Sequence, residues 1–182
     1  SVLEALAVGG GLIVPAQSPG VGPEAMQHAK ENRFEGVVAK KRDSTYQPGR
    51  RSASWIKDKI WNTQEVVIGG WRQGEGGRTS GIGALMLGIP GPDGLHFAGR
   101  VGTGFTEKDL AKLKVLLEPL HADESPFAAP LPKLDARGVT FVRPELVGEV
   151  RYSERTPDDR LRQPSWRGLR PDKAPGEVVW ES

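Results

Sequence analysis

Cysteine is absent from the 182 residues, so disulfide bonds and thiolate metal sites are excluded. Histidine is scarce, and His28, His96 and His121 lie too far apart to show the spacing of a metal site. No apolar run reaches the length of a membrane-spanning helix, and Ser1 is followed by neither a basic leader nor a cleavage pattern. These absences predict a cytoplasmic chain with no membrane partner.

The charged residues are unevenly distributed, although the net charge is only +2. Residues 35–59 hold seven cations against three anions, and residues 143–173 hold eight against six. Between them, residues 60–142 hold eight cations against nine anions. Phosphate-binding surface is therefore expected in the two basic segments, while a solvated charged face is the alternative that charge alone leaves open.

The first sixty residues predict only a few elements of secondary structure. These are a helix ending at Ala7, a strand at 12–14, a helix at 23–31, and strands at 34–41 and 54–60. The strand at 34–41 reads as buried, and the polar residues 42–52 form a loop around Pro48-Gly49. Because so few elements cannot enclose a full core, residues 1–60 are expected to be the C-terminal portion of a larger α+β domain.

Residues 61–182 predict a second, compact domain that is mostly β. Its expected strands are 65–71, 84–89, 95–101, 146–152 and 161–165, with a glycine-rich turn at 74–83. A helix begins at Thr106, where Asp109 is placed to complete a capping box. Its apolar stripe consists of Leu110, Leu113, Leu117 and Leu120. Three strands, a helix and two strands match the order of an all-β OB-fold barrel with one helix.

Charged residues occupy alternate positions in two strands of the first domain. Glu35 and Lys40 lie in the strand expected at 34–41, while Lys57 and Lys59 lie two apart on the strand expected at 54–60. Because side chains alternate between the faces of a strand, Lys57 and Lys59 share one face and Asp58 points the other way. A carboxylate suits Mg²⁺ or Mn²⁺, and lysines suit phosphate. Either signal alone is more typical of a surface, so their joint occurrence is what indicates a site.

These segments, followed downstream by Arg170-Pro171-Asp172-Lys173, resemble nucleotidyl-transfer motifs four, five and six of the ATP-dependent DNA ligases. The run from Glu35 to Lys59, with Tyr46 to Arg51 inside it, resembles the ligase domain of bacterial DNA ligase D, which serves non-homologous end joining. The resemblance implies ATP and Mg²⁺ or Mn²⁺ as cofactors and nicked or broken duplex DNA as the substrate. It also implies that residues 1–60 end an adenylation (nucleotidyltransferase) domain and that residues 61–182 are its OB-fold domain.

The resemblance further implies a role for each motif residue. Glu35 holds the metal ion. The ATP and AMP phosphate contacts are Lys40, Lys57, Lys59, Arg170, Asp172 and Lys173. The loop arginines that either contact DNA phosphates or remain solvated are Arg42, Arg50 and Arg51. The OB domain of such a ligase rotates about a linker, expected here near residues 60–63, to close over ATP and open for DNA.

The nucleophile of the family is missing from this sequence. Ligases of this kind attach AMP to the lysine of a Lys-x-Asp-Gly motif, and only Lys41 and Lys133 are followed two positions later by Asp, neither with Gly next. The chain alone is therefore predicted to be inactive in self-adenylylation. The remaining alternatives are a non-catalytic DNA-binding module, a fragment that complements the remainder of the ligase catalytic domain, and a related RNA ligase or capping guanylyltransferase.

Overall fold

The computed structural model describes residues 22–74 and 81–181. The chain divides into two compact units, residues 1–60 and 61–182. The helix expected to end at Ala7, the strand at 12–14 and most of the turn at 74–83 lie outside the described residues. Within the described ranges, none of the helices combines the length and the apolar character needed to cross a membrane.

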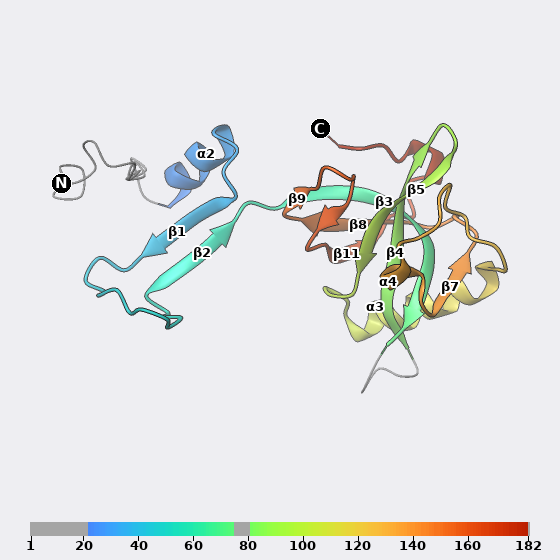
Figure 1. Cartoon of the computed structure of the whole chain (residues 1–182), viewed down its shortest axis with the longest axis horizontal. Helices are drawn as coiled ribbons and strands as arrows, with labels where there is room; N and C mark the ends of the chain where they lie inside the picture. Colours follow the sequence, from blue (N-terminus) through green and yellow to red (C-terminus); the bar gives the residue numbers. More distant parts are fainter. Residues whose placement is uncertain (1–21, 75–80, 182) are drawn as a thin grey trace. The chain divides into compact units, whose positions relative to one another are not determined.

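The described part of the first unit is one helix and one β-hairpin (Figure 1). The helix α2 (Pro23–Glu31) has the predicted bounds, with Pro in its first turn, where a missing N–H costs nothing. Strands β1 (Gly36–Lys40) and β2 (Trp55–Lys59) pair antiparallel. The helix leads directly into the hairpin, because the backbone N–H of Phe34 donates to the carbonyl of Ala29 at 2.8 Å.

The prediction that the first of these strands is buried is wrong. Val38 in β1 is 51% exposed and Ile56 in β2 is 60% exposed. The apolar composition of β1 is that of a covered strand, yet α2 is the only described helix of this unit. The hairpin therefore exposes apolar side chains that a packed domain would bury.

The second unit is an OB-fold barrel. Its five main strands are β3 (Asn62–Gln73), β4 (Ile82–Gly91), β5 (Gly94–Val101), β8 (Val147–Tyr152) and β11 (Ser165–Leu169). They form antiparallel pairs in the order β11-β8-β3-β4-β5. The backbone N–H of Trp166 at the start of β11 donates to the carbonyl of Thr103 just beyond β5, at 2.9 Å, and so links the two ends of the sheet. The helix α3 (Glu107–Leu117) connects β5 to the later strands.

Smaller elements complete the second unit. They are η2 (Glu118–Leu120), β6 (His121–Ala122), α4 (Lys133–Ala136), β7 (Val139–Val142), β9 (Glu154–Arg155), β10 (Leu161–Arg162) and η3 (Pro175–Glu177). The sequence did not predict β6, β7 or β9, and the strand expected at 161–165 is two strands, β10 and β11. The linker expected near residues 60–63 ends before Asn62, because Asn62 and Thr63 already pair with β8.

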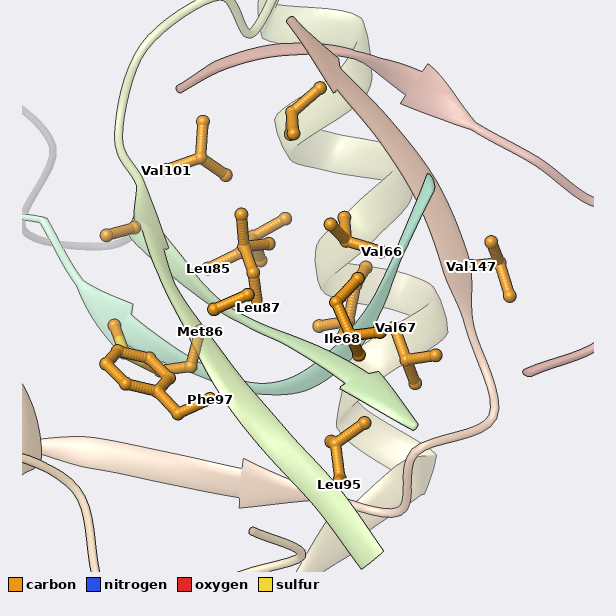
Figure 2. Packing of buried hydrophobic residues seen from close by; sticks show 14 of the residues in the cluster. Val66, Val67, Ile68, Leu85, Met86, Leu87, Leu95, Phe97, Val101 and Val147 are labelled. Carbon is orange, nitrogen blue, oxygen red and sulfur yellow. The ribbon is translucent and has the colours of Figure 1, made fainter. Parts of the chain in front are cut away.

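The core of the barrel is formed by β-branched and leucine side chains of β3 and β4 that meet those of α3 (Figure 2). Leu113 and Leu117 of α3 are each 1% exposed, which confirms the predicted apolar stripe. The predicted capping box is also confirmed: Thr106 Oγ1 accepts from the N–H of Asp109 at 3.1 Å, and Asp109 Oδ2 accepts from the N–H of Thr106 at 2.9 Å. The same barrel unit carries the charged C-terminal residues Arg170, Asp172 and Lys173.

Candidate phosphate-binding site

The β1–β2 hairpin presents three lysines on one face. In the antiparallel register, Lys59 lies opposite Gly36, Lys57 opposite Val38, and Lys40 opposite Trp55. Directly opposed residues share a face, and every second residue along a strand returns to it. Lys40, Lys57 and Lys59 therefore lie on the same face, and Asp58 lies on the other, as the spacing predicts. Three cations along one short sheet form a surface that attracts a polyphosphate.

Glu35 joins this face from the residue before β1. Its Oε2 lies 2.8 Å from Nζ of Lys57, and both side chains are more than half exposed. An exposed ion pair of this kind contributes little to stability. Its significance is positional, because it places a carboxylate, the kind of oxygen ligand that hard cations prefer, directly beside a lysine of the cationic face.

Gly36 allows the two strands to approach at this point. Its φ is +150°, and a Cβ built there would lie 2.1 Å from the carbonyl oxygen of Asp58 and 2.8 Å from Cα of Lys59. Any other residue would force β1 away from β2. The close approach of the strands therefore explains why glycine follows Glu35, since this approach keeps Glu35 within reach of Lys57.

The loop between the strands forms a cavity of about 520 Å³ beside these lysines. It is lined by Thr45, Tyr46, Gln47, Arg50, Arg51, Ser52, Trp55 and Lys57. The loop arginines Arg50 and Arg51 thus share a cavity with Lys57, whereas Arg42 does not line it. Lys57 connects this cavity to the face that carries Glu35.

Aromatic rings shape one wall of this cavity. The rings of Tyr46 and Trp55 lie 5.5 Å apart, and Nζ of Lys40 lies 4.4 Å from the centre of the Trp55 ring. Trp55 is 38% exposed, so part of its ring is open to solvent. The sequence did not predict the cavity, although Tyr46 and Trp55 flanking two arginines were a usable signal for it.

The C-terminal motif residues form a second charged cluster, within the barrel unit. Arg170 Nη1 lies 2.7 Å from Glu65 and 3.3 Å from Glu149, while its Nε and Nη2 donate to the two carboxylate oxygens of Asp172 at 3.0 and 2.8 Å. Lys173 Nζ lies 3.4 Å from the other oxygen of Glu65. Arg170, Asp172 and Lys173 are therefore brought together, and two acids that the sequence reasoning missed, Glu65 on β3 and Glu149 on β8, complete the cluster.

Hydrogen bonds from Arg170 lower the pKa of Asp172 to about 2, and Asp172 is in turn the main cause of the raised pKa of Arg170. Because the pKa of Asp172 is lower in the folded state than the ordinary 3.8, its charge stabilises the fold above pH 4, and this contribution is lost as the pH falls through 2.

We therefore expect the variant Asp172→Asn to lower the free energy of unfolding at pH 7 and to lower it less as the pH approaches 2. Denaturant unfolding of both proteins at pH 7, 5, 4 and 3 measures this difference. A difference that is as large at pH 3 as at pH 7 would show that the lost carboxylate charge is not the cause.

Comparison with known protein families finds a match in each of the two units. Residues 23–59 match the family model described as the ATP dependent DNA ligase domain, and residues 78–173 match the model of the ATP dependent DNA ligase C terminal region. The second match covers more than half of the chain. This chain therefore belongs to the ATP-dependent DNA ligase family.

The relatives with high sequence identity to this chain indicate a narrower group within that family. The chain is 84% identical, over 99% of its length, to the multifunctional non-homologous end joining protein LigD of Mycolicibacterium smegmatis. It is 66% identical over the same share to the LigD of Mycobacterium tuberculosis. The chain spans about a quarter of the length of these relatives, at 24% of each. The crystal structure of the M. tuberculosis LigD ligase domain matches with a TM-score of 0.68 and 64% identity, over 99% of this chain and 58% of that one.

Proposed function

We propose that this chain supplies the later part of the active site and the OB domain of an ATP-dependent DNA ligase that seals double-strand breaks in non-homologous end joining. The observation that carries this proposal is the shared face of the hairpin, where Glu35 lies 2.8 Å from Lys57 and where Lys40 and Lys59 lie on the same side. The names of the M. smegmatis and M. tuberculosis relatives supply the repair pathway.

The lysines of the hairpin bind the phosphate of ATP and then of AMP. Negative charge grows on phosphoryl oxygens in every step of nucleotidyl transfer, so cations fixed beforehand lower each barrier. Lys57 and Lys59, two residues apart on one strand, hold the α-phosphate from one side. Lys40 adds a contact from the neighbouring strand.

Glu35 is a suitable ligand for Mg²⁺ or Mn²⁺. These ions prefer oxygen and bind through one or two carboxylates together with substrate phosphates and water. No group of three or more acidic or histidine residues suited to a metal occurs among residues 22–74 and 81–181, so a single carboxylate beside the phosphate site fits this mode of binding. When bound, a metal ion would supply charge neutralisation at the phosphates, and Glu35 would be the residue that holds it.

The loop cavity is proposed to contact the DNA strand. Arg50 and Arg51 provide guanidinium groups for backbone phosphates, and the ring of Tyr46, 70% exposed, offers a flat surface to a base or a sugar. Arg42, at the start of the same loop, extends the basic surface. In the barrel unit, Arg170, Asp172 and Lys173 orient the departing pyrophosphate when the family lysine is adenylylated.

The test is reconstitution with the part of the catalytic domain that carries Lys-x-Asp-Gly in this family, supplied as a separate polypeptide. We expect the mixture to seal nicked duplex DNA, and the variant Lys57→Met to lower the rate by about tenfold or more, because a charge-assisted phosphate contact contributes roughly 1.5–3 kcal/mol. The matched control is Lys30→Met, which removes an exposed cation from α2 rather than from the lysine-bearing strands.

A mixture that binds nicked DNA, with affinity that falls steeply as salt is raised, but never seals it would favour the second candidate, a non-catalytic DNA-binding module. The cavity that combines aromatic rings and arginines is the observation that favours this candidate. Sealing that is unaffected by Lys57→Met would contradict the proposed role of the hairpin face.

A further inference from the structure

One charged side chain is buried with the barrel core. Among the described residues, Glu65 on β3 is the only charged residue in the buried set, and 9% of its surface is exposed. A carboxylate removed from water in this way is costly unless cations compensate it. Its position in the fold therefore requires partners, and the partners are the two cations of motif six.

The carboxylate of Glu65 bridges those cations. Its Oε1 lies 2.7 Å from Nη1 of Arg170, and its Oε2 lies 3.4 Å from Nζ of Lys173. Each oxygen thus engages one cation, which sets the ammonium of Lys173 beside the guanidinium of Arg170. Because Glu65 is part of a paired strand that leads into the core, the bridge connects the C-terminal segment to the buried core of the unit.

The hydrogen bonds of Arg170 leave it little freedom to bind anything else. A guanidinium has five N–H groups. Three of them donate to protein acceptors, one from Nη1 to Glu149 and one each from Nε and Nη2 to Asp172, and Nη1 also forms the 2.7 Å ion pair with Glu65. While these bonds last, Arg170 cannot offer a two-pronged fork to a phosphate. Within the described part of the chain, Lys173 has one ion pair, the longer contact to Glu65, so most of its donors remain available for an anion.

We propose that Glu65 is a positioning residue for motif six, which holds Lys173 at the pyrophosphate site with Arg170 as the anchor. The inference rests on the proposed function, in which motif six binds pyrophosphate. Glu65 does not touch the phosphate. It acts through Lys173, and the anchored Arg170 adds a fixed positive charge behind it.

If Glu65 positions Lys173, replacing Glu65 changes the affinity for pyrophosphate in the opposite direction to a simple charge effect. Removing a negative charge beside an anion site strengthens anion binding by Coulomb attraction alone. Loss of a positioning contact weakens binding, because Lys173 must then be ordered at the cost of its side-chain entropy. The direction of the change in affinity therefore separates a positioning residue from a competing counter-ion.

The experiment measures the affinity of the full chain for inorganic pyrophosphate at low salt, by ³¹P NMR titration. We expect Lys173→Gln to weaken binding by about tenfold and Glu65→Gln by about fivefold, as for the loss of one charge-assisted contact and of its orientation. The double variant should bind no more weakly than Lys173→Gln alone, because Glu65 acts through Lys173. Thermal unfolding of each variant confirms that it is folded.

Two further variants make the test independent of charge. Glu65→Asp keeps the charge but withdraws the carboxylate, and it should weaken binding like Glu65→Gln. Glu149→Gln removes the same charge beside Arg170 without touching Lys173, and it should bind at least as tightly as the original chain. Tighter binding by Glu65→Gln, unaltered binding by both Glu65 variants, or fully additive losses in the double variant would overturn the inference. A chain that does not bind pyrophosphate at all would instead contradict the proposed function of motif six.

Discussion

Incubation of this chain with radiolabelled ATP and Mn²⁺ is expected to give no covalent AMP adduct. The proposed phosphate contacts lower the barrier to transfer, but they cannot replace an amine that attacks the α-phosphorus. Lys57 and Lys59 are poorly suited to that attack, because they lie on the cationic face beside Glu35, where we propose that they act as charges. The measurement is a denaturing gel of the incubated chain, on which labelled protein is absent.

The control for this result is the same incubation with the Lys-x-Asp-Gly part of the catalytic domain added. Label is then expected on the added polypeptide and not on this chain. Label that stays on this chain through denaturation would identify a nucleophile among its own lysines, and mapping the labelled peptide would show which one.

The sequence was sufficient for the elements that depend on local signals. The helix α2 was predicted with its observed bounds because Pro23 and an uninterrupted helical run mark it. The capping box at Thr106 and the leucine stripe of α3 were likewise readable from spacing alone. The shared face of Lys57 and Lys59 followed from the alternation of a strand, which needs no knowledge of the tertiary fold.

The features that were missed depend on partners far away in the sequence. Strand β7 is short, and it pairs with the second half of β3, beyond the half that pairs with β8. Glu65 read as one acid at the start of a strand, and its role became visible only when Arg170, more than a hundred positions later, was found against it. The wrong prediction that β1 is buried has the same origin. The apolar sequence of a strand shows that it is suited to burial, but it does not show whether another element packs against it.

The variant Gly36→Ala is expected to disrupt the hairpin that carries the proposed phosphate site. The added Cβ would lie 2.1 Å from the carbonyl oxygen of Asp58, and the φ of +150° is one that alanine rarely adopts. Both strands are held together at this end by the bond from the N–H of Ile60 to the carbonyl of Glu35, at 2.9 Å. Relief of the clash moves β1 away from β2, breaks that bond and withdraws Glu35 from Lys57.

Amide hydrogen exchange of β1 and β2 in the isolated chain measures this opening directly. We expect Gly36→Ala to speed exchange by roughly 100-fold, equivalent to about 3 kcal/mol of strain released by opening, and sealing in the reconstituted mixture to fall by about as much. The matched control is Gly49→Ala in the loop, whose φ is +69° but whose added Cβ has nothing within 4 Å. That variant bears the backbone strain without the clash, so it should lose only about 1–2 kcal/mol of local stability and leave Glu35 beside Lys57. Equal effects of the two substitutions would show that backbone conformation alone, and not the close approach of the strands, requires glycine in the Glu-Gly pair.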